Sequence, residues 1–312
     1  MNLTEHPLTL FLVFNAGVVL LLLADLLLFQ RKSHEVKMSE ALKMVAVWVA
    51  LGLAFNVFVY FYKGETAAMQ YFTGYVVEYA LSMDNVFVFI MIFTYFSVPA
   101  KYQHRVLFWG ILGAMLMRGG FIFAGTELIK RFDFLMYVLG AFLILTGIKL
   151  LKTGSEEIHP ERNAALKLFR KIFPVTKDYE GGKFLVRREH KTWATPLLVV
   201  LVLLETTDIV FAVDSIPAIF GITDDPFIIY SSNLFAILGL RALYFVLAGF
   251  MKRFRYLNIG LCVVLIFIGC KMIVRKWYHA PDWLMLTVVA GIIIVSVLAS
   301  VFATGDESDK KV

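Results

Sequence analysis

Charged residues are scarce in this chain of 312 amino acids. They make up 17% of the sequence, whereas a soluble domain carries about a quarter. Hydrophobic residues account for 60%, and the mean hydropathy is +0.76. Runs of roughly 20 apolar residues recur along the whole chain, and each is long enough to cross a bilayer as a helix. The composition therefore excludes an ordinary soluble domain and predicts an all-α polytopic membrane protein.

Cysteine is almost absent as well. Cys262 and Cys270 both fall in one late apolar run, without a CxxC pattern. This usage excludes a disulfide framework and favours two small buried hydrophobic side chains. No nucleophile–base set and no phosphate-binding loop stands out, so we do not expect an enzyme. The net charge of +6 does not indicate nucleic-acid binding, because the basic residues lie between the hydrophobic runs and are better interpreted as determinants of topology.

Length and flanking charge predict nine membrane-spanning helices within one transmembrane domain, 1–312. We expect them at residues 10–29, 41–62, 72–96, 105–125, 134–151, 194–219, 227–250, 257–274 and 283–303. The only long connection is a basic loop, 152–193. The last residues, 304–312, are polar and are expected to form a disordered tail.

The distribution of Lys and Arg predicts the orientation of these spans. With the N-terminus outside, 22 of the 30 basic residues fall in inside loops, 6 fall in outside loops and two lie within spans. Basic residues concentrate in short cytoplasmic loops, so the N-terminus is expected in the periplasm and the C-terminus in the cytoplasm. The loop 152–193 is then cytoplasmic. Its stretch "NAALKLFRKIF" predicts either an interfacial helix on anionic lipid or a partner-binding segment, and the sequence does not separate the two.

Ionisable residues inside the spans are the main functional signal. Each one is unfavourable at a bilayer centre by about 2.5–3.5 kcal/mol on insertion scales. Six carboxylates against two guanidiniums leave an excess of four negative charges, which ion pairing alone cannot neutralise. The eight residues are Asp25, Glu78, Asp84, Arg118, Glu205, Asp208, Asp214 and Arg241. We interpret the carboxylates as lining a site that needs negative charge, the two arginines as partners that hold carboxylates in place, and Asp25 as equally compatible with a peripheral position.

Neutral oxygen donors accompany these acids. Asn85 follows Asp84, Ser215 follows Asp214, and Asn233 lies in a later span. All six histidines fall in loops or at span ends, and no cysteine joins the group. Carboxylate, amide and hydroxyl oxygens without imidazole or thiolate favour the hard divalent ions Mg²⁺, Ca²⁺ and Mn²⁺, and the sequence leaves the choice among them open.

The spacing of the acids predicts irregular helices. Residues six apart on an ideal helix are separated by roughly 120°, so Glu78 and Asp84 would share a face only if the helix were broken between them. Pro217 supplies such a break in the sixth span, because it cannot donate to the carbonyl of Val213, next to Asp214. Unwound carbonyls near the membrane midplane commonly coordinate cations in transporters.

Two acidic segments suggest an internal repeat. "EYALSMDNV" begins at Glu78 and "DIVFAVDSI" at Asp208, and their acids align. The next span of each half contains "ILG", at 111–113 and 237–239, followed by Arg118 and Arg241. Spans three to five are therefore predicted to be related to spans six to eight. Because the separation is an odd number of spans, the two units would have inverted topology, with an ion site at their interface.

The segments "EYALSMDNVFVF" and "ETTDIVFAVDSIPAIF…NLFAILGLRALYF" resemble the signature segments of the TerC/Alx family of integral membrane proteins. The similarity extends over nearly the whole chain and is strongest at 72–96 and 203–246. It implies a polytopic bacterial inner-membrane protein with manganese efflux as its activity. Relatives are associated with tellurite resistance or with redox modulation. The acidic motif residues carried over are Glu78, Asp84, Asn85, Glu205, Asp208 and Asp214.

The sequence thus favours a Mn²⁺ exporter that exchanges the metal for protons, with no permanently bound cofactor and no nucleic-acid partner. Its metal ligands would be the six residues of the acidic motif, supported by Arg118, Arg241, Asn233, Ser215 and Asp25. A membrane scaffold that assists assembly of other proteins and a redox modulator are the alternatives. The oligomeric state stays open.

Overall fold

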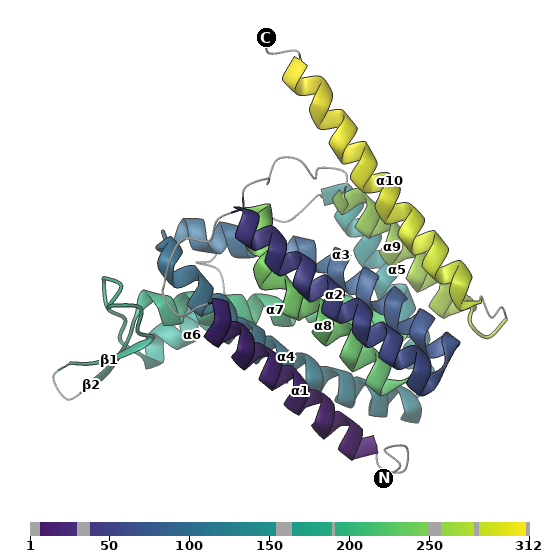
Figure 1. The fold of residues 1–312 in the computed structure, drawn as a ribbon, viewed down its shortest axis with the longest axis horizontal. Coiled ribbons are helices and arrows are strands. Elements are labelled where there is room, and N and C mark those ends of the chain that lie inside the picture. Colours follow the sequence, from purple (N-terminus) through teal and green to yellow (C-terminus); the bar gives the residue numbers. More distant parts are fainter. Residues whose placement is uncertain are drawn as a thin grey trace.

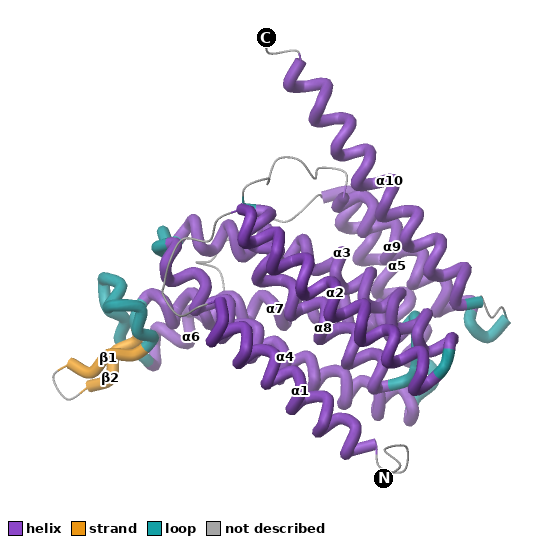
Figure 2. Tube along the Cα trace, viewed as in Figure 1, coloured by secondary structure: helices purple, strands orange, loops and turns teal. Residues whose placement is uncertain are grey.

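The computed structural model describes residues 7–29, 38–153, 164–188, 191–248, 257–277 and 281–309. Over these ranges the chain forms ten helices and one small antiparallel sheet (Figures 1 and 2). The helices are α1 (Pro7–Phe29), α2 (Met38–Lys63), α3 (Glu65–Tyr95), α4 (Ala100–Arg131), α5 (Leu135–Thr153), α6 (Ala164–Ile172), α7 (Pro196–Phe220), α8 (Pro226–Leu247), α9 (Leu257–Val274) and α10 (Asp282–Asp309), and the strands are β1 (Leu185–Arg188) and β2 (Lys191–Ala194).

The prediction of an all-α polytopic membrane protein is confirmed, since each predicted span coincides with one long helix. In the described part of the chain, seven helices are long and apolar enough to cross a membrane. Helices α1 and α9 contain shorter apolar stretches, Thr9–Asp25 and Ile259–Val274. The number of nine spans therefore stays a prediction.

Local chemistry sets several helix boundaries. Gly64 separates α2 from α3 with φ of 92°, a conformation that residues with a Cβ rarely adopt. Pro196 begins α7 at the first turn, where a missing N–H removes no helical hydrogen bond. Asp225 caps α8, and its Oδ1 accepts from the backbone N–H groups of Phe227 and Ile228. These short caps allow long helices to follow one another with few connecting residues.

Helix α8 forms the centre of the bundle. Its membrane-length window is 100% buried, and α2, α3 and α4 pack around it. Helix α3 also contacts α2, α7 and α10, whereas α5 packs mainly against α9 (Figure 1). A helix without a lipid-facing side is where polar residues are best shielded from the hydrocarbon.

The described connections between helices lie at two ends of the bundle. We call one the hairpin end; it holds the α3–α4 turn at 96–99, α6 and the β1–β2 hairpin (Figure 2). The Tyr179 hydroxyl donates to the carbonyl of Phe96 at 2.7 Å and ties these parts together. We call the other the turn end; it holds the turns at residue 64 and at 221–225 and the start of α10. There Gln70 hydrogen-bonds both Thr223 and Asp282.

The segment 152–193, predicted as a loop, is largely structured where it is described. The stretch "NAALKLFRKIF" forms α6 from Ala164, and the loop returns through β1 and β2, with Leu185 opposite Ala194. Leu166 is buried against the bundle, whereas Leu168 and Ile172 are exposed. Residues 154–163 lie outside the described ranges. At the other end of the chain, α10 continues to Asp309, so 304–309 are helical where the sequence predicts a disordered tail; 310–312 are not described.

The predicted helix breaks are absent, which corrects the interpretation of the acid spacing. Helix α3 runs without interruption through Glu78 and Asp84, and α7 runs through Asp214 with Pro217 inside it. Pro217 lies in the last turn of α7, where losing one hydrogen bond does not end the helix.

The helix contacts are compatible with the predicted repeat of α3–α5 and α7–α9. Such a repeat requires that each contact between the units has a counterpart when the units are exchanged. The contact of α3 with α8 has its counterpart in the contact of α7 with α4. The pairs α3–α7, α4–α8 and α5–α9 are their own counterparts, and all of these contacts occur. Contacts alone do not establish a common fold, so the repeat stays a prediction.

The α5–α9 contact is close because glycines face each other. A Cβ at Gly269 would lie 2.6 Å from the carbonyl oxygen of Gly140, and one at Gly140 would lie 2.9 Å from that of Gly269. Small residues that allow backbones to approach are typical of helix pairs in membranes.

We expect Gly269→Ala to destabilise the protein by about 1–3 kcal/mol, because the new methyl group meets backbone that cannot move aside. Thermal unfolding of the purified full chain in detergent measures this. Gly120→Ala is the matched control, since nothing lies within 4 Å of that position and alanine favours a helix. Equal melting temperatures for the two variants would contradict the packing role.

Candidate functional site

A buried arginine joins two acids from different helices. Arg118 of α4 binds Asp208 of α7 with two parallel hydrogen bonds, Nε to Oδ2 at 3.0 Å and Nη2 to Oδ1 at 2.8 Å. Its Nη1 donates to Oε1 of Glu78 on α3. Asn233 of α8 accepts from the same Nη1 at 3.4 Å, and Ser82 donates to Oε1 of Glu78 at 3.4 Å. These five residues are called the Arg118 cluster.

The Arg118 cluster is almost completely shielded. Glu78 is 0% exposed, Arg118 1% and Asp208 4%. One guanidinium faces two carboxylates, so ionised side chains leave a formal charge of −1. Among the described residues, Oε2 of Glu78 and Nδ2 of Asn233 are buried without a hydrogen-bond partner. Buried charge and unpaired polar atoms are unfavourable, so such a site is typical of function rather than of stability.

Helical register brings each acid to the interior. On α3, Glu78, Ser82 and Asn85 follow the i, i+4, i+7 spacing of one face, and all three are buried. On α7, Asp208 and Ser215 are also seven apart and buried. Ser82 was missed by the sequence reasoning, although its position four residues after Glu78 was the available signal.

The two helices run in opposite directions. Gln70, near the start of α3, hydrogen-bonds Thr223, just beyond the end of α7. Because Glu78 and Asp208 meet at one arginine, residues after Glu78 lie toward the hairpin end, whereas residues after Asp208 lie toward the turn end. A rise of 1.5 Å per residue places Asn85 and Ser215 about 10 Å from the cluster on opposite sides.

The helix directions also place the backbone of Asp84 and Asp214, whose side chains are outside the described part of the structure. Each lies six residues after its cluster acid, which is about 9 Å along a continuous helix. Asp84 is thus displaced toward the hairpin end and Asp214 toward the turn end. The expected single pocket requires all four acids at one level of the bundle. Unbroken helices do not place the four positions at one level.

A small cavity adjoins the cluster on its hairpin-end side. It has a volume of about 20 Å³, enough for one water-sized occupant. Glu205, Asp208 and Arg241 provide its polar groups, and apolar residues of α3, α4, α7 and α8 form the rest of its wall. Oε2 of Glu205 is buried without a partner among the described residues. A Cβ at Gly113 would overlap this carboxylate, so the glycine of the first "ILG" creates the space for Glu205.

The second buried arginine is occupied elsewhere. Arg241 of α8 forms an ion pair with Asp25 of α1 through Nη2, and the two residues are 2% and 6% exposed. Asp25 is therefore buried and paired, not peripheral. Nη1 of Arg241 has no hydrogen-bond partner among the described residues, and Arg241 is one of the residues that line the small cavity.

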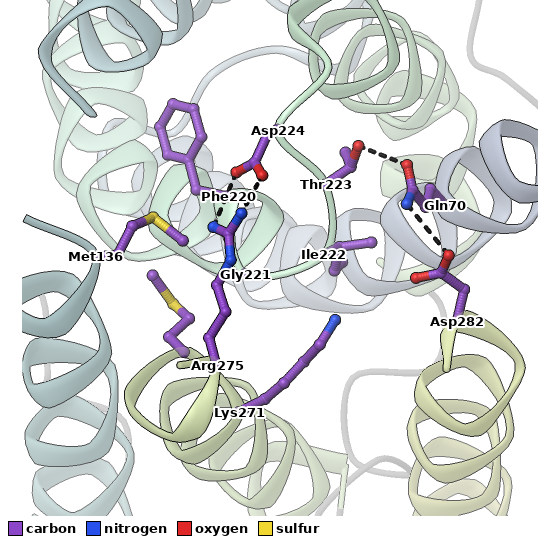
Figure 3. Close-up of a pocket in the computed structure, with 11 residues that line it drawn as sticks. Gln70, Met136, Phe220, Gly221, Ile222, Thr223, Asp224, Lys271, Arg275 and Asp282 are labelled. Carbon is purple, nitrogen blue, oxygen red and sulfur yellow. Dashed lines mark hydrogen bonds and ion pairs between the residues drawn. The ribbon is translucent and has the colours of Figure 1, made fainter. Parts of the chain in front are cut away.

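A larger cavity of about 200 Å³ opens at the turn end (Figure 3). The two guanidinium Nη atoms of Arg275 bind the two carboxylate oxygens of Asp224, and Gln70 bridges Thr223 and Asp282. Lys271 extends into the same space (Figure 3). Two acids and two basic residues balance in charge, so this cavity is not a second acidic site.

No group of three or more His, Cys, Asp or Glu side chains with metal-ligand geometry occurs in the described residues. Of the six predicted ligands, Glu78 and Asp208 meet directly at Arg118. Glu205 lies beside the small cavity, three residues before Asp208. Asn85 is buried about 10 Å from the Arg118 cluster, toward the hairpin end. In this conformation the two central acids are bound to a guanidinium.

Comparison with known proteins gives a consistent result. Residues 63–308 match the model of the "Integral membrane protein TerC family". The chain is 47% identical to "Uncharacterized membrane protein STKORF319" of Myxococcus xanthus, covering 92% of this chain and 90% of that protein. It is 44% identical to "Putative membrane-bound redox modulator Alx" of Salmonella typhi (96% and 95% covered) and of Escherichia coli K12 (91% of each). No solved structure matches at a significant level.

The ion pair between α1 and α8 yields a stability prediction. We expect Asp25→Asn to destabilise the protein by about 3–5 kcal/mol, because Arg241 then keeps a buried charge without its counter-ion. Unfolding in mixed micelles, followed by tryptophan fluorescence, measures the loss. The double variant Asp25→Asn, Arg241→Gln should recover part of it. A double variant as unstable as the sum of both single variants would show that the two side chains do not interact.

Proposed function

Because the chain belongs to the TerC family of integral membrane proteins, we propose that it exports divalent metal ions, with Mn²⁺ as the main substrate, across the bacterial inner membrane. The observation that carries this proposal is the meeting of Glu78 and Asp208 at one buried point. They come from helices of opposite direction and share a single positive charge. A site that keeps excess negative charge away from water is suited to binding a cation transiently.

The ligand chemistry supports a hard divalent ion. Apart from the Arg118 guanidinium, the described candidate ligand atoms near the centre are carboxylate, amide and hydroxyl oxygens, from residues such as Glu78, Asn233 and Ser82. These oxygens suit Mn²⁺, Mg²⁺ and Ca²⁺ better than Zn²⁺ or Cu²⁺.

The arrangement along the membrane normal supports a path with successive positions. With the hairpin end in the cytoplasm, an ion would enter past Asp84 and Asn85 and reach Glu205 beside the small cavity. It would then bind between Glu78 and Asp208 and leave past Asp214 and Ser215 toward the larger cavity. Rocking of one three-helix unit against the other would open the two sides in turn.

Proton exchange is a natural coupling for such a site. Carboxylates that lose a metal ion in a low-dielectric interior are stabilised by taking up protons, because both species neutralise the same charge. We propose that protons entering from the periplasm replace the exported ion.

The alternatives find less support in the described residues. Redox modulation through an intrachain disulfide does not fit, because Cys262 and Cys270 are eight residues apart on one helix, about 12 Å. A disulfide needs Cα atoms within roughly 4.4–6.8 Å. A scaffold function would use the hairpin end, so deleting 155–190 would abolish it while acid-to-amide changes in the bundle would not.

We expect purified wild-type protein in liposomes to move Mn²⁺, and Glu78→Gln and Asp208→Asn each to lower the flux at least tenfold, because each removes one ligand charge from the centre. Metal-sensitive dye inside the vesicles measures the flux. Cys262→Ala with Cys270→Ala is the control that retains full flux under this proposal. Wild-type vesicles that move no Mn²⁺ in either direction would overturn it.

A pH gradient should drive this transport. Vesicles with an acidic lumen are expected to accumulate Mn²⁺ above its external concentration, because outward proton movement is exchanged for the metal. Nigericin with potassium on both sides should abolish the accumulation. Flux that is identical with and without the gradient would remove the proton coupling and leave the metal pathway in place.

A further inference from the structure

We propose that Arg118 acts as a tethered cation that occupies the substrate position when no metal ion is bound, so that Mn²⁺ must displace it. The inference rests on the proposed function and concerns the regulation of the same site. It starts from the fact that one guanidinium satisfies Glu78 and Asp208 together, across the two predicted repeat units.

The first argument is positional. Arg118 uses Nε and Nη2 for Asp208 and Nη1 for Glu78, so its guanidinium lies between the two carboxylates. A metal ion that bridges these acids needs the same space and the same oxygens. Bound metal and the present arginine contacts therefore exclude each other.

The second argument comes from charge. Without a cation, Glu78 and Asp208 would repel each other at a point where Glu78 is 0% exposed and Asp208 is 4% exposed. Arg118 removes most of that repulsion but leaves a charge of −1, and Oε2 of Glu78 stays unpaired among the described residues. A divalent ion would neutralise both acids, so the metal competes with the arginine for them as the metal concentration rises.

The two arginines of the bundle differ in a way that supports this role. Arg241 holds one acid, Asp25, on a helix outside the predicted repeat. Arg118 holds two acids, one from each unit, and it comes from α4, which packs against both α7 and α8. Release of Arg118 by a metal ion would therefore loosen α4 from α3 and α7 at the same moment that the acids gain a new partner.

This arrangement has a kinetic consequence. An exporter must return without its ion, and bare carboxylates oppose any movement through a low-dielectric interior. Arg118 supplies one of the two missing positive charges during that return, and a proton taken up by the carboxylates supplies the other. Removing it should favour the loaded state and hinder the empty one.

The test uses equilibrium binding of Mn²⁺ to the purified full chain in detergent. Arg118→Gln is expected to bind Mn²⁺ roughly 10- to 100-fold more tightly than the wild type, because no guanidinium then competes with the metal ion for the two carboxylates. Arg188→Gln is the control for loss of an arginine that pairs with a carboxylate, since Arg188 binds Glu180 in the exposed hairpin segment. Its affinity should equal that of the wild type.

Flux measurements provide a second readout. In liposomes, Arg118→Gln should slow net Mn²⁺ efflux while retaining exchange of labelled for unlabelled Mn²⁺, because exchange does not require the empty carrier to return. A purely structural role would lower the affinity and both kinds of flux together.

The outcomes separate the two proposals. Wild type that neither binds nor moves Mn²⁺ contradicts the transport function itself. Wild type that binds Mn²⁺ while Arg118→Gln binds equally or more weakly overturns the tethered-cation role alone. If Arg118→Gln fails to fold, infrared difference spectra decide. Mn²⁺ should produce a guanidinium difference band in the wild type that does not appear in Arg118→Lys, and a wild-type spectrum without such a band would refute displacement.

Discussion

The ion-pair geometry around Arg118 is the constraint on which the rest of the bundle depends. A buried ionised carboxylate needs a counter-charge, and here one guanidinium serves two acids from α3 and α7. The position of Arg118 on α4 forces three helices to meet at one depth, and Asn233 adds the central helix α8. Elsewhere in the bundle, close helix contacts such as the glycine pair of α5 and α9 fix the positions of the surrounding helices. The same interaction leaves negative charge in excess, which is the basis of the proposed cation binding.

Much of the fold could be predicted from the sequence because membrane helices are long, apolar and flanked by charge. The long helices fall where length and hydropathy predicted them, with ends set by local signals such as Gly64 and Pro196. The loop 152–193 was less predictable, since the β1–β2 hairpin is held by long-range contacts, for example from Thr176 to Ala194, that no short pattern reveals.

The site was predictable in part. The rarity of acids in lipid identified Glu78 and Asp208, and the structure brings both to Arg118. The partner of each arginine could not be predicted, because Arg118 and Arg241 both follow an "ILG" sequence within five residues yet meet acids on unrelated helices. The expectation that Asp84 and Asp214 share one pocket with them relied on helix breaks that α3 and α7 do not contain. Continuous helices instead distribute the acid positions along the membrane normal, which favours a path over a single cage.

The central claim is that Glu78 and Asp208 form a cation site that an arginine holds in the metal-free state. The most direct measurement is a cryo-electron microscopy structure of the full chain in lipid nanodiscs, determined with saturating Mn²⁺ and again with chelator. The account predicts density for an ion between the two carboxylates only with Mn²⁺, with the Arg118 guanidinium withdrawn from them. Unchanged arginine contacts in the presence of bound Mn²⁺ elsewhere in the molecule would contradict it.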